Sequence, residues 1–174
     1  MFRKETLNID LLTLQDEPFE ATYILKDEYF GSLEDATIRK GDVCVEVTVS
    51  KVASSEYNLA MKLAGTVVVP CDLCLDDMDQ PVKTECSYTV KLGAEPSEDE
   101  EVIVVDENGG VLSIAWLIYE TIVLAIPIKH VHAPGKCNAA MTQKLEELSA
   151  TRSGDEETET GVDPRWAELE KLKH

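Results

Sequence analysis

Three stretches in the first half of the chain alternate apolar and polar residues with a period of two. Valine occupies every second position of residues 42–50, and Leu, Met and Val recur in the same way over residues 57–69. Residues 82–92 carry Val, Thr, Cys, Tyr and Leu on one side and Lys, Glu, Ser and Thr on the other. Successive side chains of a strand point to opposite faces, so this alternation is typical of strands with one buried face. Because the connections are short, the three runs predict an antiparallel sheet.

Helices are predicted in the second half. The apolar run 111–128 contains Glu120 near its middle and Pro127 near its end, which favours a buried helix over roughly 113–125 and not a membrane span. Residues 138–150 place Met, Leu and Leu at i, i+4 and i+7 behind an asparagine that can cap the helix. The expected fold class is therefore α+β, with an antiparallel β-sheet, a buried apolar helix and C-terminal helices.

The end of the chain predicts an appendage to a single α+β domain over residues 1–150. Residues 151–162 are charged and without periodicity, which is typical of a flexible acidic linker. Residues 163–174 then predict a short helix that is marginal alone in water, so it docks either on the protein's own core or on a partner. We predict a partner-docking helix. Its apolar face consists of Trp166, Leu169 and Leu172.

The charge of the chain limits its partners. With 16 basic and 34 acidic residues the net charge is −18, which makes nonspecific binding to nucleic acid weak and favours basic partners. The N-terminus lacks the apolar segment of a signal peptide, and the five cysteines are an odd number. These features predict a cytoplasmic protein in a reducing compartment, with no membrane partner and no disulfide framework. We find no motif for a small-molecule substrate.

Cys71 and Cys74 form a C-x2-C motif in the connection between two predicted strands. Redox chemistry needs a low thiol pKa, and the four aspartates among residues 72–79 disfavour a metal-free thiolate. No βαβ pattern surrounds the motif either, as a thioredoxin-like site would require. A tight turn between strands instead presents two sulfurs to one Zn²⁺, whose charge offsets the thiolates. The motif therefore predicts a hairpin tip that binds zinc.

A zinc site needs two further ligands, and residues 128–138 supply the candidates. We predict Zn²⁺ held by Cys71 and Cys74 together with His132 and Cys137, with His130 as the alternate third ligand. The two histidines can equally be solvated loop residues. Cys86 is a further available ligand, but it lies on the apolar side of its predicted strand and is interpreted as a small buried side chain. Cys44 is interpreted as structural or unimportant.

Two further patterns concern RNA. Residues 121–145 contain no Asp or Glu, so phosphate can approach there, and the contact candidates are Lys129, Lys136 and Lys144. Three lysines without interleaved aromatic residues make a sparse patch, and a chance gap in the acids explains it equally well. The carboxylates at 76, 77 and 79 can bind Mg²⁺ in a nuclease, although acidic loop residues are far more often solvated surface.

Three segments carry a family resemblance. These are "GTVVVPCDLCLDDMDQPV", the apolar "WLIYETIVLAIPIK" and the terminal "DPRWAELEKLK". In this order they resemble the YceD family of large ribosomal RNA subunit accumulation proteins, over roughly residues 40–174. The resemblance implies a noncatalytic protein that supports accumulation or processing of large-subunit ribosomal RNA. Family members often carry more cysteines after the helix, whereas this chain has two histidines and Cys137 there, so a metal site would be a mixed Cys/His site.

We therefore expect a ribosome-biogenesis factor rather than an enzyme. The acidity favours a basic ribosomal protein, or the ribonucleoprotein precursor of the large subunit, over naked RNA. Two alternatives are kept: a metal-dependent ribonuclease acting on precursor ribosomal RNA, and a zinc-knuckle protein–protein adaptor.

Overall fold

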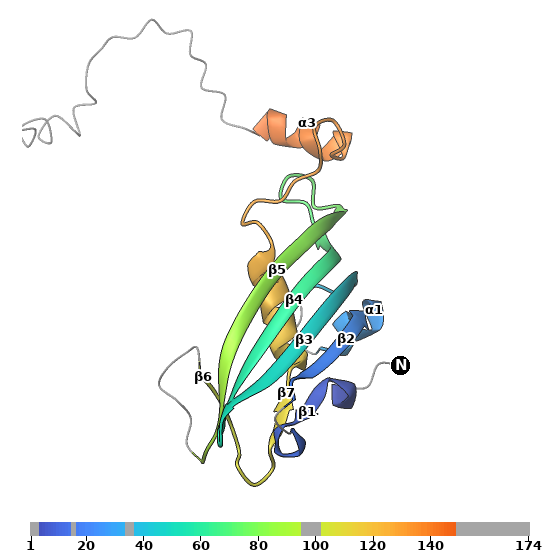
Figure 1. Cartoon of the computed structure of the whole chain (residues 1–174). Helices are drawn as coiled ribbons and strands as arrows, with labels where there is room; N and C mark the ends of the chain where they lie inside the picture. Colours follow the sequence, from blue (N-terminus) through green and yellow to red (C-terminus); the bar gives the residue numbers. More distant parts are fainter. Residues whose placement is uncertain (1–3, 15–16, 34–36, 95–101, 149–174) are drawn as a thin grey trace, which may run out of the picture.

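The structure is a computed structural model that describes residues 4–14, 17–33, 37–94 and 102–148. The predicted linker over 151–162 and docking helix over 163–174 lie outside the described residues. The described part of the chain is a curved sheet with one long helix behind it (Figure 1). This arrangement confirms the α+β fold class.

A five-stranded sheet has the order β2–β3–β4–β5–β6. Its strands are β2 (Phe19–Leu25), β3 (Gly41–Ala53), β4 (Glu56–Pro70), β5 (Asp77–Leu92) and β6 (Val102–Val105). The three strands predicted from alternation are β3, β4 and β5, and each is longer than its predicted run. Pairs among β2–β5 are antiparallel, as expected, but β6 runs parallel to β5. The four residues of β6 carry no sequence signal of strand direction.

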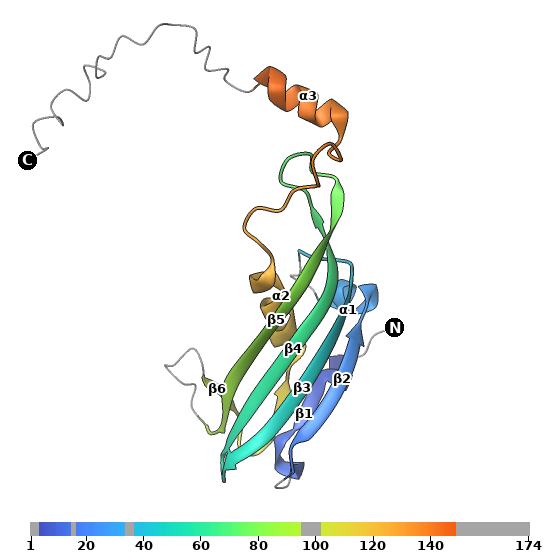
Figure 2. The ribbon, with the colours of Figure 1, turned by 45° about the horizontal axis from the view of Figure 1, so that its top comes forward.

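The core lies on the inner face of this sheet. There α2 (Ala115–Ala125) packs beside a two-stranded sheet of β1 (Asn8–Asp10) and β7 (Val111–Ser113), and α1 (Asp27–Ser32) lies near the start of β3 (Figures 1 and 2). Two short 3-10 turns, η1 (Lys4–Leu7) and η2 (Leu11–Thr13), flank β1. The buried residues of β3, β4 and β5 belong to the apolar set of the alternation: Val43, Val45, Val47, Val49, Tyr57, Leu59, Met61, Leu63, Val67, Val69, Val82 and Val90.

The helix α2 is buried on one side only. Ile118 and Ile122 are fully buried against the sheet, whereas Leu124 is 82% exposed and Trp116 is 43% exposed. The nearly continuous apolar run therefore corresponds to a helix whose outer side is also apolar. No helix in the described ranges is long and apolar enough to cross a membrane.

Two features of the sheet position the C-x2-C motif. A Cβ on Gly65 would lie 2.6 Å from the Cα of Val43, so the close approach of β4 to β3 requires glycine there. Further along, β3 begins at Gly41 opposite Val67, and β4 and β5 continue as a two-stranded ribbon to the pair of Pro70 and Asp77. The motif thus stands at the end of a hairpin that projects beyond the rest of the sheet (Figure 2).

Candidate metal centre

The turn between β4 and β5 forms the first half of the site. We call residues 71–76 the knuckle. The backbone N–H of Cys71 donates to the carbonyl of Asp76 over 2.9 Å, and that of Leu75 donates to the carbonyl of Cys71 over 2.9 Å. Leu75 has a φ of +63°, a left-handed conformation that lets the chain turn back sharply after Cys74. The N–H of Leu73 points at the Cys71 sulfur, 3.4 Å away. Both cysteine side chains are buried.

The second half of the site comes from residues 126–138, which we call the arm. Pro127 cannot continue α2, so the chain leaves the helix and returns to the knuckle. The arm is fastened there by its backbone: the N–H of Asp72 donates to the carbonyl of His130 over 3.0 Å. In return, the N–H of His130 donates to Oδ2 of Asp72 over 2.7 Å. Asn138 donates its side-chain amide to Oδ2 of Asp76 over 3.1 Å, which closes the far end of the arm on the knuckle.

These contacts bring four side chains together. One ligand atom from each of Cys71, Cys74, His132 and Cys137 lies within 4.8 Å of the other three. The sulfurs of Cys71 and Cys137 are 3.9 Å apart, and the Cys74 sulfur is 3.4 Å from Nδ1 of His132. In a tetrahedral site with Zn–S of about 2.3 Å and Zn–N of about 2.0 Å, neighbouring ligands lie roughly 3.5–3.8 Å apart. The donor set and its spacing therefore fit a tetrahedral metal ion.

In the metal-free cluster the pKa values of Cys71 and Cys137 shift in opposite directions. Burial pushes the Cys71 pKa upward, but hydrogen bonds from the backbone of Cys74, His132 and Leu73 and from the His132 ring outweigh it, and the pKa falls to about 6. For Cys137, burial, hydrogen bonds to Cys71 and Cys74 and their negative charge all act in one direction and raise the pKa to about 11. The cluster thus favours a thiolate at Cys71 even without metal, so the expectation that the neighbouring aspartates disfavour one is wrong for this thiol. The same cluster keeps the Cys137 proton until a cation replaces it.

The other candidates lie elsewhere. His130 is outside the cluster: its Nδ1 lies 3.0 Å from the carbonyl of Pro127, and its Nε2 lies 3.7 Å from Asp72. Cys44 is exposed on the outer face of the sheet, and Cys86 is half-buried with its sulfur 3.6 Å from the Thr121 hydroxyl. Among the described residues, the carboxylates at 76, 77 and 79 do not form a second group of possible metal ligands.

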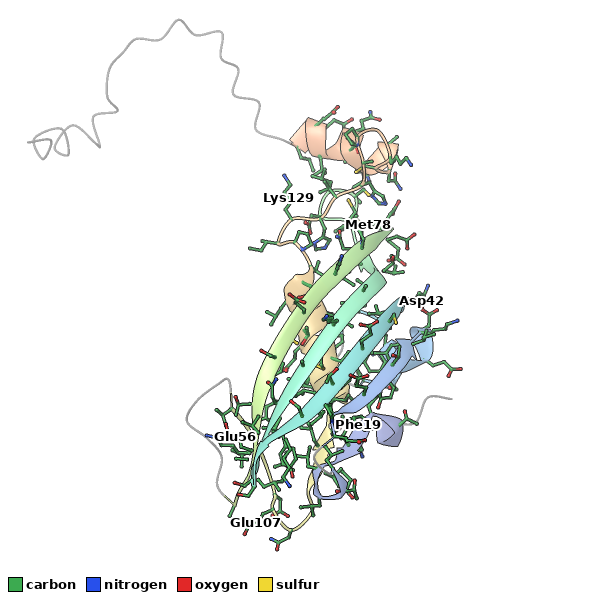
Figure 3. All side chains as sticks on the ribbon, viewed as in Figure 1. Phe19, Asp42, Glu56, Met78, Glu107 and Lys129 are labelled. Atoms are coloured by element: carbon green, nitrogen blue, oxygen red, sulfur yellow. The ribbon has the colours of Figure 1, made fainter. Side chains whose placement is uncertain are left out.

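The three predicted RNA-contact lysines are exposed on the arm and on α3 (Ala139–Leu148). Figure 3 shows Lys129 toward the end of the molecule opposite Glu107. Asn138 caps α3 by accepting from the N–H of Ala140 over 3.1 Å, as predicted. We use the word tip for the knuckle, the arm and α3 together.

Sequence reasoning missed the hydrogen bonds of Asp72 and Asp76 to the arm. Asp76 was interpreted as a solvated surface acid or an Mg²⁺ ligand, and Asp72 was considered only for its charge beside the thiols. Their partners lie 58 and 62 residues away in the sequence, and no periodic pattern links the two segments. The available signal was chemical: carboxylates near a metal site commonly support its ligands through hydrogen bonds, and Asp72 and Asp76 flank the predicted ligand pair.

The fold and the cluster define a small α+β protein with a mixed Cys/His group at the end of a long β-hairpin. The family model described as "Large ribosomal RNA subunit accumulation protein YceD" matches residues 59–173, and the chain belongs to this family. No curated protein and no solved structure matches the chain. The match begins in β4 and includes both segments of the cluster, which confirms the resemblance seen in the sequence.

Proposed function

We propose that this protein is a noncatalytic ribosome-biogenesis factor that supports accumulation or processing of large-subunit ribosomal RNA. The observation that carries the proposal is the family match over residues 59–173. The net charge of −18 supports action through a basic ribosomal protein or a preformed ribonucleoprotein and not through naked RNA. The five free thiols suit a reducing, cytoplasmic compartment.

Depletion of the protein in its own cells tests this role. We expect mature large-subunit ribosomal RNA to fall and its precursors to accumulate, while small-subunit RNA changes little. Re-expression of the wild-type chain is expected to restore the ratio. An unchanged ratio of the two mature RNAs after depletion would refute the proposed role, and cleavage of precursor RNA by the purified protein would refute the noncatalytic part.

The tip is proposed to hold one structural Zn²⁺ through Cys71, Cys74, His132 and Cys137. The support is the chemistry of the four donors and their spacing within 4.8 Å. Zinc would join the knuckle, which connects β4 and β5, to the arm, which follows α2. Elemental analysis of protein without a histidine tag is expected to give about one zinc per chain. Less than about a tenth of an equivalent, after growth with added zinc, would contradict the assignment.

Two partner surfaces complete the proposal. The lysines at 129, 136 and 144 are proposed to meet phosphate groups once a basic partner has brought the protein to the particle. Weak and strongly salt-dependent binding to unstructured RNA is expected from so few lysines in a negative field.

The second partner surface is the proposed docking helix with Trp166, Leu169 and Leu172. Deletion of residues 151–174 is expected to abolish association with ribosomal particles while the melting temperature stays nearly unchanged. A fall of several degrees would instead place Trp166 in the protein's own core, since burial of such a ring contributes a few kcal/mol.

A further inference from the structure

A groove of about 760 Å³ lies between the arm and α3. Its walls are largely carbon. Leu73 contributes from the knuckle, Val131 and Pro134 from the arm, and Ala139 and Leu145 from α3. Leu73 is 45% exposed and Leu145 is 43% exposed, so both present their side chains at the surface and not to the core.

The helix α3 has no buried side chain among its ten residues, all of which the structure describes. Its predicted apolar face is nevertheless present, and Leu148 on the last turn is 84% exposed. An amphipathic helix derives most of its stability from packing of its apolar face. On this face of α3 Met141 is half-buried, whereas Leu145 and Leu148 are exposed, so much of the face is left without packing within the described part of the chain. Figures 1 and 2 show α3 beyond the end of the sheet, with no other labelled element over it.

The groove shares a wall with the candidate metal centre. His132 and Cys137 line the groove on one side and belong to the ligand cluster on the other. Whatever fixes the arm against the knuckle therefore also fixes the shape of the groove. Gly135 lies in the arm between these two residues and has a φ of +79°, the left-handed conformation that favours glycine.

Charge decides which occupant fits. Of the described residues that line the groove, the one with a carboxylate or ammonium group is Glu146, and no lysine lines it. Across residues 70–80 and 128–148 there are six carboxylates and three lysines. Three thiolates around one Zn²⁺ would add a further net negative charge. The lysines of the arm and α3 lie outside the lining, so an RNA strand in the groove itself would meet carbon walls and a carboxylate. A basic protein segment would find the same carbon walls with more carboxylates than lysines around them.

We infer that this groove binds a short amphipathic segment of a basic protein, which inserts apolar side chains between the arm and α3 and places its basic side chains over the surrounding carboxylates. The inference rests on the proposed function, since it names the mode by which a basic ribosomal protein would be recognised. Apolar anchors at helical spacing are one established way to occupy such a groove.

Two pairs of leucines make the test specific. Leu73 and Leu145 line the groove, whereas Leu75 of the knuckle and Leu148 of α3 are exposed leucines outside it. The probe is a short fluorescent peptide of leucine and lysine with leucine at i, i+3, i+4 and i+7. A second peptide has the same composition but strict alternation. Binding to the zinc-loaded full chain is followed by fluorescence anisotropy at physiological ionic strength.

The helical probe is expected to bind more tightly than the alternating one. Leu145→Gln and Leu73→Gln are each expected to weaken it by about tenfold, since each removes a buried apolar contact. Leu148→Gln and Leu75→Gln, which leave the groove intact, are expected to change the affinity by less than about twofold. Circular dichroism and zinc content of each variant check that the tip is formed.

Several outcomes would overturn the inference. Equal affinities for the two peptides, or equal losses at the lining and the control leucines, would show only charge attraction. A tenfold gain in probe affinity on Trp166→Ala would show that the protein's own C-terminal segment occupies the groove. An RNA oligonucleotide whose binding depends on Leu145 would assign the groove to RNA. Any of these results would leave the depletion experiment, and with it the proposed role in ribosomal RNA accumulation, standing.

Discussion

The inner face of the sheet and the tip that it carries differ in what holds them together. Along β3 and β4 nearly every second side chain is buried in the core that includes α2 and the small β1–β7 sheet, and on β5 the same side is buried at Val82 and Val90 and half-buried between them. Among the described residues of the tip, the buried side chains are Cys71 and Cys74. The tip is joined instead by a few hydrogen bonds to Asp72 and Asp76 and by the cluster of possible metal ligands. Burial of apolar area is distributed over many contacts, whereas the tip depends on a few polar ones, so the two regions should fail under different conditions.

Loss of the two ligand cysteines of the knuckle is expected to have the largest effect. That effect should be limited to the tip. Cys71→Ser combined with Cys74→Ser should lower zinc content from about one equivalent to less than a tenth. Structural zinc contributes on the order of 10 kcal/mol to the folding of small sites, so amides of the arm and α3 should exchange at least tenfold faster. Amides of β3 and β4 should keep their protection. Hydrogen exchange read by mass spectrometry measures both regions at once.

Cys44→Ser is the control for this experiment, because Cys44 is an exposed thiol on the same sheet and outside the cluster. It should change neither zinc content nor exchange. If the double variant exposed β3 and β4 as strongly as the arm, the sheet and the tip would form one cooperative unit and the comparison would be wrong.

The second-largest effect is expected from a core substitution, which should destabilise the sheet without changing the tip. Ile118→Ala removes a fully buried side chain from the face of α2 that packs on the sheet. Such truncations cost about 2–5 kcal/mol through lost burial and the cavity left behind. Urea denaturation of the zinc-loaded protein should show this loss, while the zinc content of the folded variant stays at about one equivalent.

Leu124→Ala on the same helix supplies the control, because Leu124 is 82% exposed. Its expected effect is within about 0.5 kcal/mol. A loss of zinc in Ile118→Ala at urea concentrations where the sheet is still folded would show that α2 packing, and not the local hydrogen bonds, positions the arm.

The difference between the apolar core of the sheet and the polar contacts of the tip also explains which parts of the structure the sequence could predict. Burial in the sheet repeats every second residue, so β3, β4 and β5 were visible from their alternation. The residues Phe19, Ala21, Tyr23 and Leu25 alternate in the same way in β2, but the run is short and was not assigned. The three-residue strands β1 and β7 pair across a separation of about a hundred residues, and no local pattern encodes that contact.

At the tip, the chemistry of the ligands was more informative than any periodicity. Two cysteines at C-x2-C spacing require partners, and the later cysteine and histidines were few enough to propose the set that the structure brings together. The prediction placed His132 in the set and kept His130 as the alternate ligand, because both lie in one loop. The hydrogen bond from the His130 backbone N–H to Asp72 depends on the fold and could not be seen in the sequence. Nor did it show that the apolar face of α3 lies uncovered.

A smaller effect is expected from the contact that fastens the arm. Asp72→Asn keeps the size of the side chain but removes the charge that strengthens its 2.7 Å hydrogen bond from the His130 N–H. Hydrogen bonds to charged groups contribute about 1.5–3 kcal/mol, and loss of such supporting contacts weakens metal binding by roughly 10- to 100-fold. We expect zinc affinity, measured by competition with a chromophoric chelator, to fall by about tenfold at unchanged stoichiometry.

Asp79→Asn provides the matched control, since Asp79 is an exposed carboxylate of β5 beyond the knuckle. It removes the same charge from the same hairpin. Equal losses of zinc affinity in the two variants would show that Asp72 acts through its negative charge alone and not through its hydrogen bond to the arm.

The smallest expected effect is on the ionisation of the thiols in the metal-free protein. It tests whether the arm packs on the knuckle before metal binds. With a pKa near 6, the Cys71 thiol loses its proton more readily in the folded cluster than in the unfolded chain, where the ordinary value is 9.0. Its contribution to stability is therefore full above pH 9 and is lost as the pH falls through 6. Cys137 is opposite: its pKa of about 11 makes its contribution full below pH 9, and the contribution is lost as the pH rises through 11.

Thiolate absorbance in the presence of a chelator, measured from pH 5 to 11, should thus show an early step near pH 6 that Cys71→Ser removes. A late step near pH 11 should be absent in Cys137→Ser. Cys44→Ser should keep both steps, because its thiol lies outside the cluster. If all thiols of the wild-type protein instead ionised together near pH 9, the arm would not rest on the knuckle without metal. The hydrogen bonds to Asp72 and Asp76 would then be too weak to close the tip, and metal would be required for the arrangement that lines the groove.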